Sequence, residues 1–253
     1  GPELMKQMRK QAEKFGAKII SKKVTAVDFK NQPLKVIVGD ETFETEAVIV
    51  STGARAMRLG LPGEEKLYGK GISACATCDG YFFRDKVVVV VGGGDAAMEE
   101  ATFLTKFASR VIVVHRREAL RASQPMQERA KNNPKIEFVF NSEVIEIFGI
   151  NEGKLSGVKI KNLVTNETKD LEAEGMFVAI GHAPATEIFK GQLELDQKGY
   201  VVTKSKTTET SVKGVFAAGD VADYRYRQAI TAAGSGCAAA IDVERFLEHK
   251  HES

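Results

Sequence analysis

The stretch Val87–Ala97, VVVVVGGGDAA, decides the fold that the sequence predicts. Five consecutive valines indicate a strand, and the unit that it begins is typical of a parallel sheet. The residues that follow fit the pattern G-x-G-x-x-A. In this pattern Gly92 suits a tight turn, Gly94 a close approach to phosphate and Ala97 the packing of a helix on the strand. The alternative is a plain strand-to-helix turn without a ligand.

A helix is expected over about residues 95–108, beginning with Asp95 and Ala96. Its free N–H groups and the positive end of its dipole would attract phosphate. A second strand follows at residues 111–114, so the whole forms a strand–helix–strand unit typical of a parallel sheet. The sequence therefore predicts an α/β fold with a nucleotide at the carboxyl end of the first strand.

The second strand ends in basic residues, His115, Arg116 and Arg117, with Arg121 nearby. An NAD site carries Asp or Glu at this position, where the carboxylate holds the ribose 2′-hydroxyl. Guanidinium groups instead suit a doubly charged 2′-phosphate, which favours NADP(H) over NAD(H). The alternative is an ordinary solvated basic face.

Composition excludes several classes of protein. The 253 residues are 43% hydrophobic, which is enough to build a core, so a disordered chain is excluded. A net charge of +2 gives no general attraction to nucleic acid or to an anionic membrane. No apolar run approaches the length of a membrane span, and no export signal is visible, so we expect a cytoplasmic protein without nucleic-acid or membrane partners.

Apolar strands that end in glycine recur along the chain. They lie at residues 47–54, 176–184 and 214–222, as expected at the carboxyl edge of open α/β sheets, where nucleotides bind. Further strands are predicted at residues 18–20, 23–29 and 34–38, and a meander at 136–180. Helices are predicted at 3–15, 123–132 and 227–248.

Cys75 and Cys78 form a C-x-x-C pair for which three interpretations compete. Zinc would need two further ligands, and the remaining cysteine and the histidines are scattered, so no metal site is expected. A buried structural pair is the second interpretation. A redox dithiol is the third and is favoured beside a nucleotide site, with Asp79 as a proton shuttle or, alternatively, a turn residue. Cys237 is expected to be buried and without a role.

A disulfide does not accept hydride directly, so a nicotinamide cofactor would need a mediator, usually a flavin. Gly219 and Asp220 follow an apolar strand, and a carboxylate there could bind a ribitol hydroxyl. A helix or turn cap is the alternative role of Asp220.

Together these motifs resemble those of bacterial-type, low-molecular-weight thioredoxin reductases. The resemblance covers nearly the whole chain in family order, at residues 73–80, 92–97, 115–121, 178–182, 214–221 and 227–230. It implies a homodimer of chains with two Rossmann-like, three-layer ββα domains, the NADPH domain being inserted into the FAD domain. The insert is expected at residues 57–182, and the FAD domain at 1–56 and 183–253.

The resemblance also implies roles for single residues. Electrons would pass from NADPH to FAD, then to the disulfide through Cys78, and from Cys75 to thioredoxin, with Asp79 as acid and base. Asp220 would hold the FAD ribityl group. The other cofactor-binding residues implied for NADPH or FAD are Gly92, Gly94, Asp95, Ala96, Ala97, His115, Arg116, Arg117, Arg121, Ile180, Gly181, Gly219, Arg227, Gln228 and Ala229.

One departure from the family pattern concerns FAD. The family begins with a strand and a G-x-G-x-x-G turn that grip the FAD pyrophosphate, and no such segment precedes Gly92 here. We therefore expect the N-terminal part of the FAD domain to be missing from this chain. The missing segment leaves one alternative, a flavin-free NADPH-binding fragment without activity. A separate alternative is a flavoprotein that reduces peroxiredoxins, which shares the two-domain layout but differs in the residues between its cysteines.

Overall fold

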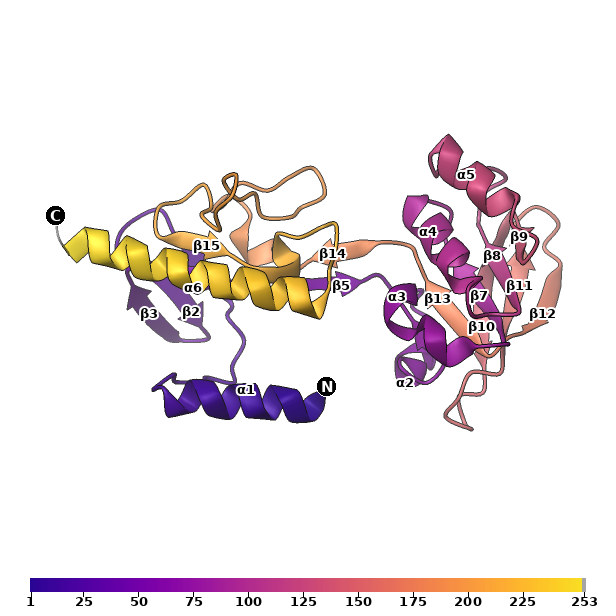
Figure 1. The fold of residues 1–253 in the computed structure, drawn as a ribbon, viewed down its shortest axis with the longest axis horizontal. Helices are drawn as coiled ribbons and strands as arrows, with labels where there is room; N and C mark the ends of the chain where they lie inside the picture. Colours follow the sequence, from indigo (N-terminus) through magenta and orange to yellow (C-terminus); the bar gives the residue numbers. More distant parts are fainter. Residues whose placement is uncertain (252–253) are drawn as a thin grey trace. The chain divides into compact units, whose positions relative to one another are not determined.

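The computed structural model describes residues 1–251, and the side chains of residues 1–249 (Figure 1). The chain forms two compact units. The first, here called the split unit, comprises Gly1–Ala54 and Pro184–Ser253; the second, the inserted unit, is Arg55–Ala183.

A five-stranded parallel sheet forms the centre of the inserted unit. Its strand order is β6-β13-β7-β8-β9, and every pairing in it is parallel. The strands are β6 (Ile72–Ser73), β13 (Gly175–Val178), β7 (Val87–Val91), β8 (Arg110–Val114) and β9 (Ile136–Val139). The valine run is thus a strand of a parallel sheet, as the sequence predicts, and the structure places it at the centre of that sheet.

The valines of β7 alternate between two hydrophobic cores. Val89 and Val91 pack with residues of an antiparallel sheet formed by β10 (Ser142–Phe148), β11 (Gly157–Asn162) and β12 (Thr168–Glu172). Val88 and Val90 pack instead with the buried side of helix α4 (Asp95–Leu104). The inserted unit therefore has three layers, with an antiparallel sheet on one face of the parallel sheet and helices on the other.

Helix α4 ends at Leu104, four residues before the predicted end. Thr105 turns its hydroxyl back to the carbonyl oxygen of Thr102, and the Lys135 ammonium donates to the carbonyl oxygens of Thr105 and Ala108. Lysine near a helix end satisfies its last carbonyls. These contacts lead the chain into β8. Helix α5 (Gln124–Lys131) packs into the same hydrophobic core as α4. Its bounds are close to the predicted 123–132.

The split unit combines a short parallel pair with an antiparallel sheet. Strands β4 (Val48–Val50) and β15 (Val215–Ala217) are parallel neighbours, and β1 (Ala26–Asp28), β2 (Leu34–Val38) and β3 (Glu41–Thr45) form the antiparallel sheet. Strand β1 is shorter than the predicted 23–29. The strand predicted at 18–20 is absent because this exposed segment has no pairing partner among the described strands.

Two long helices belong to the split unit. Helix α1 (Pro2–Lys14) has no buried residue among those described, and helix α6 (Ala229–His251) begins close to its predicted start. Short elements complete the chain: β5 (Ala54–Ala56) pairs with β14 (His182–Pro184), and α2 (Glu64–Leu67), α3 (Ala76–Asp79), η1 (Gly80–Phe83), η2 (Glu187–Phe189) and η3 (Gly219–Val221) are single turns. No helix in the described part of the chain is long and apolar enough to cross a membrane.

Phe83 anchors the segment after the cysteine pair to the core. Its ring packs edge-on against Phe177, with centroids 5.2 Å apart, and a Cβ added at Gly175 would lie 2.5 Å from it. We expect Phe83→Ala to lower the free energy of unfolding of the inserted unit by about 3 kcal/mol, because it leaves a cavity in this packing. Urea denaturation measures the change.

Phe82 provides the matched control, because the same residue type stands one position earlier and is 69% exposed. Phe82→Ala should change the unfolding free energy by less than about 0.5 kcal/mol. Equal losses for the two variants would contradict the anchoring role of Phe83.

Candidate active site

Cys75 and Cys78 form a disulfide at the start of helix α3. Strand β6 brings the chain to this point, and Cys75 takes the N-cap position of the helix. The Cys78 N–H donates to Cys75 Sγ at 3.2 Å. Cys78 is exposed and Cys75 is half-buried. The single helical turn thus holds both sulfurs in bonding range at the surface of the inserted unit.

Asp79 is connected to this disulfide through Ser73. The buried Ser73 hydroxyl donates to Asp79 Oδ2 at 2.6 Å and accepts from the Cys75 N–H at 3.0 Å. The carboxylate is therefore held in a fixed position beside the cysteine turn. Sequence reasoning identified Asp79 but missed Ser73, whose only signal was its position two residues before the first cysteine.

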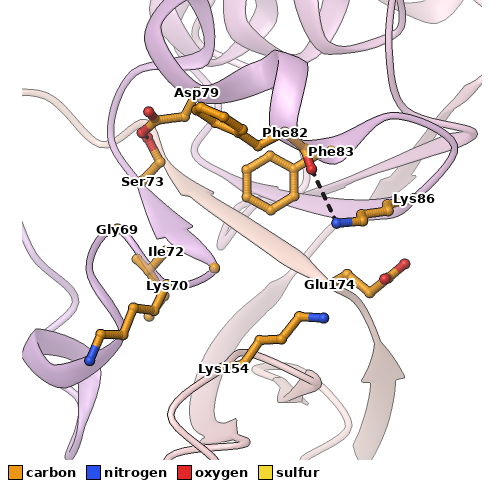
Figure 2. Close-up of a pocket in the computed structure, with 11 residues that line it drawn as sticks. Gly69, Lys70, Ile72, Ser73, Asp79, Phe82, Phe83, Lys86, Lys154 and Glu174 are labelled. Carbon is orange, nitrogen blue, oxygen red and sulfur yellow. Dashed lines mark hydrogen bonds between the residues drawn. The ribbon is translucent and has the colours of Figure 1, made fainter.

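A pocket of about 320 Å³ opens beside Asp79 (Figure 2). Lys86 lines this pocket, and its ammonium group donates to the Phe82 carbonyl oxygen at 3.1 Å. The Lys154 side chain reaches toward the same pocket. The complete lining is Gly69, Lys70, Gly71, Ile72, Ser73, Asp79, Phe82, Phe83, Lys86, Lys154 and Glu174. The pocket therefore combines aromatic surface with ammonium groups next to the redox pair.

The glycine-rich turn is built as tightly as its pattern requires. A Cβ at Gly92 would lie 2.4 Å from the Ala179 carbonyl oxygen, and one at Gly93 would lie 2.3 Å from the His115 ring. At Gly94, by contrast, a Cβ would meet nothing within 4 Å, so the turn opens there on free space. Helix α4 has no side-chain cap at its N-terminus. Its first N–H groups can therefore serve an anion.

His115 lies beneath this turn rather than on the surface. It is 4% exposed, and its Nε2 donates to the Ala119 carbonyl oxygen at 3.1 Å. Burial lowers the pKa of His115, and the neighbouring arginines lower it further, so the ring stays neutral at neutral pH. The side chains of Arg116, Arg117 and Arg121 are exposed at the same strand end.

Ile180 and Gly181 follow the neighbouring strand β13 and are half-buried. The Met57 N–H donates to the Gly181 carbonyl oxygen at 2.9 Å, and Gly181 has a φ of +116°, which favours glycine. The carboxyl ends of β7, β8 and β13 therefore gather the predicted nucleotide residues of the inserted unit.

The split unit contains a second cavity, of about 240 Å³. Its lining includes four residues predicted to bind cofactor, Gly219, Asp220, Gln228 and Ala229, together with Ser51, Gly53, Ala218, Ala232 and Gly236. Burial raises the pKa of Asp220, the nearby Asp223 raises it further, and Arg227 opposes both. The Arg227 N–H donates to Asp223 Oδ2 at 3.1 Å, but Arg227 does not line this cavity.

Cys237 is exposed, so the prediction that it is buried is wrong. Among the described residues of α6, Ala239 is fully buried, and Cys237 lies two positions away, on a different face of the helix. Within the described residues, no group of three His, Cys, Asp or Glu side chains could hold a metal ion.

Comparison with known proteins places the chain in a family. The model of the pyridine nucleotide-disulphide oxidoreductase family matches residues 2–236. The chain is 56% identical over 247 residues to a thioredoxin reductase of Mycolicibacterium smegmatis, covering 98% of this chain and 79% of the relative. It is 55% identical to one of Streptomyces coelicolor, covering 98% and 76%.

Solved structures agree with the sequence comparison. The thioredoxin reductase of Giardia duodenalis superposes with a TM-score of 0.91 at 45% identity, and that of Streptococcus pyogenes with 0.92 at 42% identity. Each match covers 98% of this chain and 81% of the other. The fold prediction of two Rossmann-like units is thereby confirmed, and the chain belongs to the thioredoxin reductase family of pyridine nucleotide-disulphide oxidoreductases.

Proposed function

We propose that this chain reduces the disulfide of thioredoxin, using electrons from NADPH that reach the Cys75–Cys78 pair by way of FAD. The observation that carries the proposal is the surface disulfide with Asp79 held beside it by Ser73. In this proposal the inserted unit binds NADPH and the split unit binds FAD. The bounds of the inserted unit, Arg55–Ala183, are close to those predicted for the NADPH domain, 57–182. The homodimer stays a prediction.

The inserted unit fits NADPH on its own geometry. Gly94 opens on free space at the uncapped N-terminus of α4, which offers room and N–H donors to a pyrophosphate. Arg116, Arg117 and Arg121 present exposed guanidinium groups at the end of β8, where the fold meets the ribose. None of these three arginines forms a salt bridge in the described part of the chain, so their charges are available to a 2′-phosphate.

The split unit fits part of FAD. Its cavity has Gly53 and Gly219 at the carboxyl ends of β4 and β15, and a Cβ at Gly53 would meet nothing within 4 Å. The half-buried Asp220 carboxylate lines the same cavity and can accept a hydrogen bond from a ribityl hydroxyl. Gln228 and Ala229 line it from the start of α6. When bound, the two cofactors would supply a hydride and pass its electron pair on to the disulfide.

The cysteine turn would then perform thiol–disulfide exchange. An electron pair and a pair of protons convert the Cys75–Cys78 disulfide to a dithiol. The Cys75 thiolate attacks the substrate disulfide, forms a mixed disulfide and displaces one substrate thiolate. The Cys78 thiolate then attacks Cys75 Sγ, restores the internal disulfide and releases the second substrate thiolate. Asp79, fixed by Ser73, takes and returns the proton of the active thiol.

The surface next to the disulfide is suited to a protein substrate. Tyr81 and Phe82 are 61% and 69% exposed and stand within four residues of Cys78. Exposed aromatic residues are enriched at protein interfaces. The pocket beside them adds the ammonium groups of Lys86 and Lys154, which favour an acidic or carbonyl-rich partner surface. We therefore place the docking surface for thioredoxin at these aromatic and basic residues.

The dithiol step predicts that Cys75→Ser abolishes reduction of thioredoxin, because the attacking thiolate is lost. The assay follows NADPH oxidation with oxidised thioredoxin as substrate and FAD supplied. Cys237→Ser is the matched control and should retain full activity, since Cys237 belongs to the split unit and has no disulfide partner. Undiminished turnover by Cys75→Ser would contradict the proposal.

The docking surface predicts an effect on KM alone. Phe82→Ala should raise the KM for thioredoxin about 5- to 10-fold, the usual cost of truncating an interface aromatic, and leave kcat within about 2-fold. Reduction of the small disulfide 5,5′-dithiobis(2-nitrobenzoate) should be unchanged, because this substrate needs no docking surface. An equal loss with both substrates would instead indicate damage to the redox centre.

The arginine cluster predicts the choice of cofactor. Replacing Arg116 and Arg117 by Gln should raise the KM for NADPH at least about 10-fold, while the KM for NADH changes little, because only NADPH carries the 2′-phosphate. Arg129→Gln, an exposed arginine on α5, is the charge-matched control. Equal losses for both nucleotides would overturn the assignment of the 2′-phosphate.

A further inference from the structure

The segment that carries Arg121 is fastened to the glycine-rich turn at several points. The N–H groups of Arg121 and Ala122 both donate to the Gly93 carbonyl oxygen, at 2.7 and 3.1 Å. The next residue, Ser123, donates from its N–H and from its hydroxyl to Asp95 Oδ1, at 2.7 and 2.8 Å. Together these four hydrogen bonds join two loops that are distant in the sequence.

The Asp95 side chain is the charged member of this set. Asp95 is the first residue of α4, and hydrogen bonds from Ser123 lower the pKa of its carboxyl group, so the group is an anion at neutral pH. An anion there suits the helix dipole, but it would repel a phosphate bound at the same helix end. Its engagement by Ser123 directs the carboxylate oxygen toward the arginine segment and leaves the backbone N–H groups of the turn to a ligand.

The position of Arg121 depends on these backbone contacts because its own side chain has no ion pair in the described part of the chain. Leu120 and Ala122, which flank it, are buried at 9% and 6% exposure and point into the core beside α4. The guanidinium group is thus carried on a short stretch whose two flanks are anchored. Ser123 bonded to Asp95 closes the C-terminal flank.

We propose that the Asp95–Ser123 pair is a positioning clasp that sets Arg121 at a fixed distance from the glycine-rich turn, and so determines the preference for a 2′-phosphorylated nucleotide. The inference rests on the proposed NADPH site and assigns the Asp95 side chain a role that its motif alone does not indicate. Asp95 acts through Arg121 and is a positioning residue, while its backbone N–H stays a candidate phosphate donor.

Simple electrostatics and the clasp predict opposite signs for the same substitution. Removal of an anion near the phosphates relieves Coulomb repulsion, which by itself should tighten binding of every nucleotide. If the clasp positions Arg121, removal of Asp95 should instead weaken binding, and only of a ligand with a 2′-phosphate. The two effects can be separated with 2′,5′-ADP and 5′-AMP, which share the adenosine 5′-phosphate and differ in the 2′-phosphate.

Isothermal titration calorimetry of the purified protein with these two probes tests the clasp without turnover. We expect Asp95→Ala to weaken 2′,5′-ADP about 5- to 10-fold, and Ser123→Ala, which keeps one of the two donors, about 2- to 3-fold. Binding of 5′-AMP should change less than about 2-fold in both. Glu99→Gln, an exposed carboxylate further along α4, controls for the loss of charge and should weaken neither probe.

The outcomes separate the clasp from the proposed function. If the unsubstituted protein prefers 2′,5′-ADP but Asp95→Ala and Ser123→Ala retain that preference, the clasp is overturned and the NADPH site stands. If the unsubstituted protein shows no preference, the NADPH assignment fails and the clasp with it. Equal weakening of both probes by Asp95→Ala would also overturn the clasp, because it would indicate general damage to the turn.

Discussion

The central constraint in the inserted unit is the burial of β7 between two cores. Its valines alternate between the antiparallel sheet and α4, so the strand cannot shift by one residue without exchanging the two faces. The end of the strand is therefore fixed, and with it Gly92, whose missing side chain lets the Ala179 carbonyl approach. The phosphate-binding geometry proposed here depends on that fixed strand end.

Parallel pairing gathers the remaining residues at the same edge. In a parallel sheet all strands end at one side, so β6, β7, β8 and β13 lead there to the cysteine segment, the glycine-rich turn, the arginine cluster and Ile180. The same parallel sheet therefore positions both the disulfide and the glycine-rich turn. This arrangement explains how residues from distant parts of the sequence come to lie along one edge of the sheet.

Local sequence patterns predicted those features of the inserted unit that depend on local chemistry. Hydrophobic periodicity and residue type suffice to predict the valine strand, the turn at Gly92 and the basic end of the second strand. Contacts between distant residues were not readable. Gly93 must be glycine because the His115 ring lies against it, and α4 stops early, with the Lys135 ammonium bonded to the carbonyl oxygens of Thr105 and Ala108 beyond its end. The exposure of Cys237 likewise follows from tertiary packing, whereas the Ser73–Asp79 hydrogen bond is local but depends on the exact shape of the cysteine turn, which residue type does not encode.

The most direct test of the account is the redox state of the cysteines after addition of NADPH. The purified protein with FAD is incubated with NADPH in the absence of thioredoxin, alkylated and analysed by peptide mass spectrometry. The account predicts that NADPH makes Cys75 and Cys78 newly alkylated, whereas Cys237 is alkylated with or without it. Alkylation of Cys237 alone, with Cys75 and Cys78 still joined, would contradict the claim that NADPH supplies electrons to this disulfide.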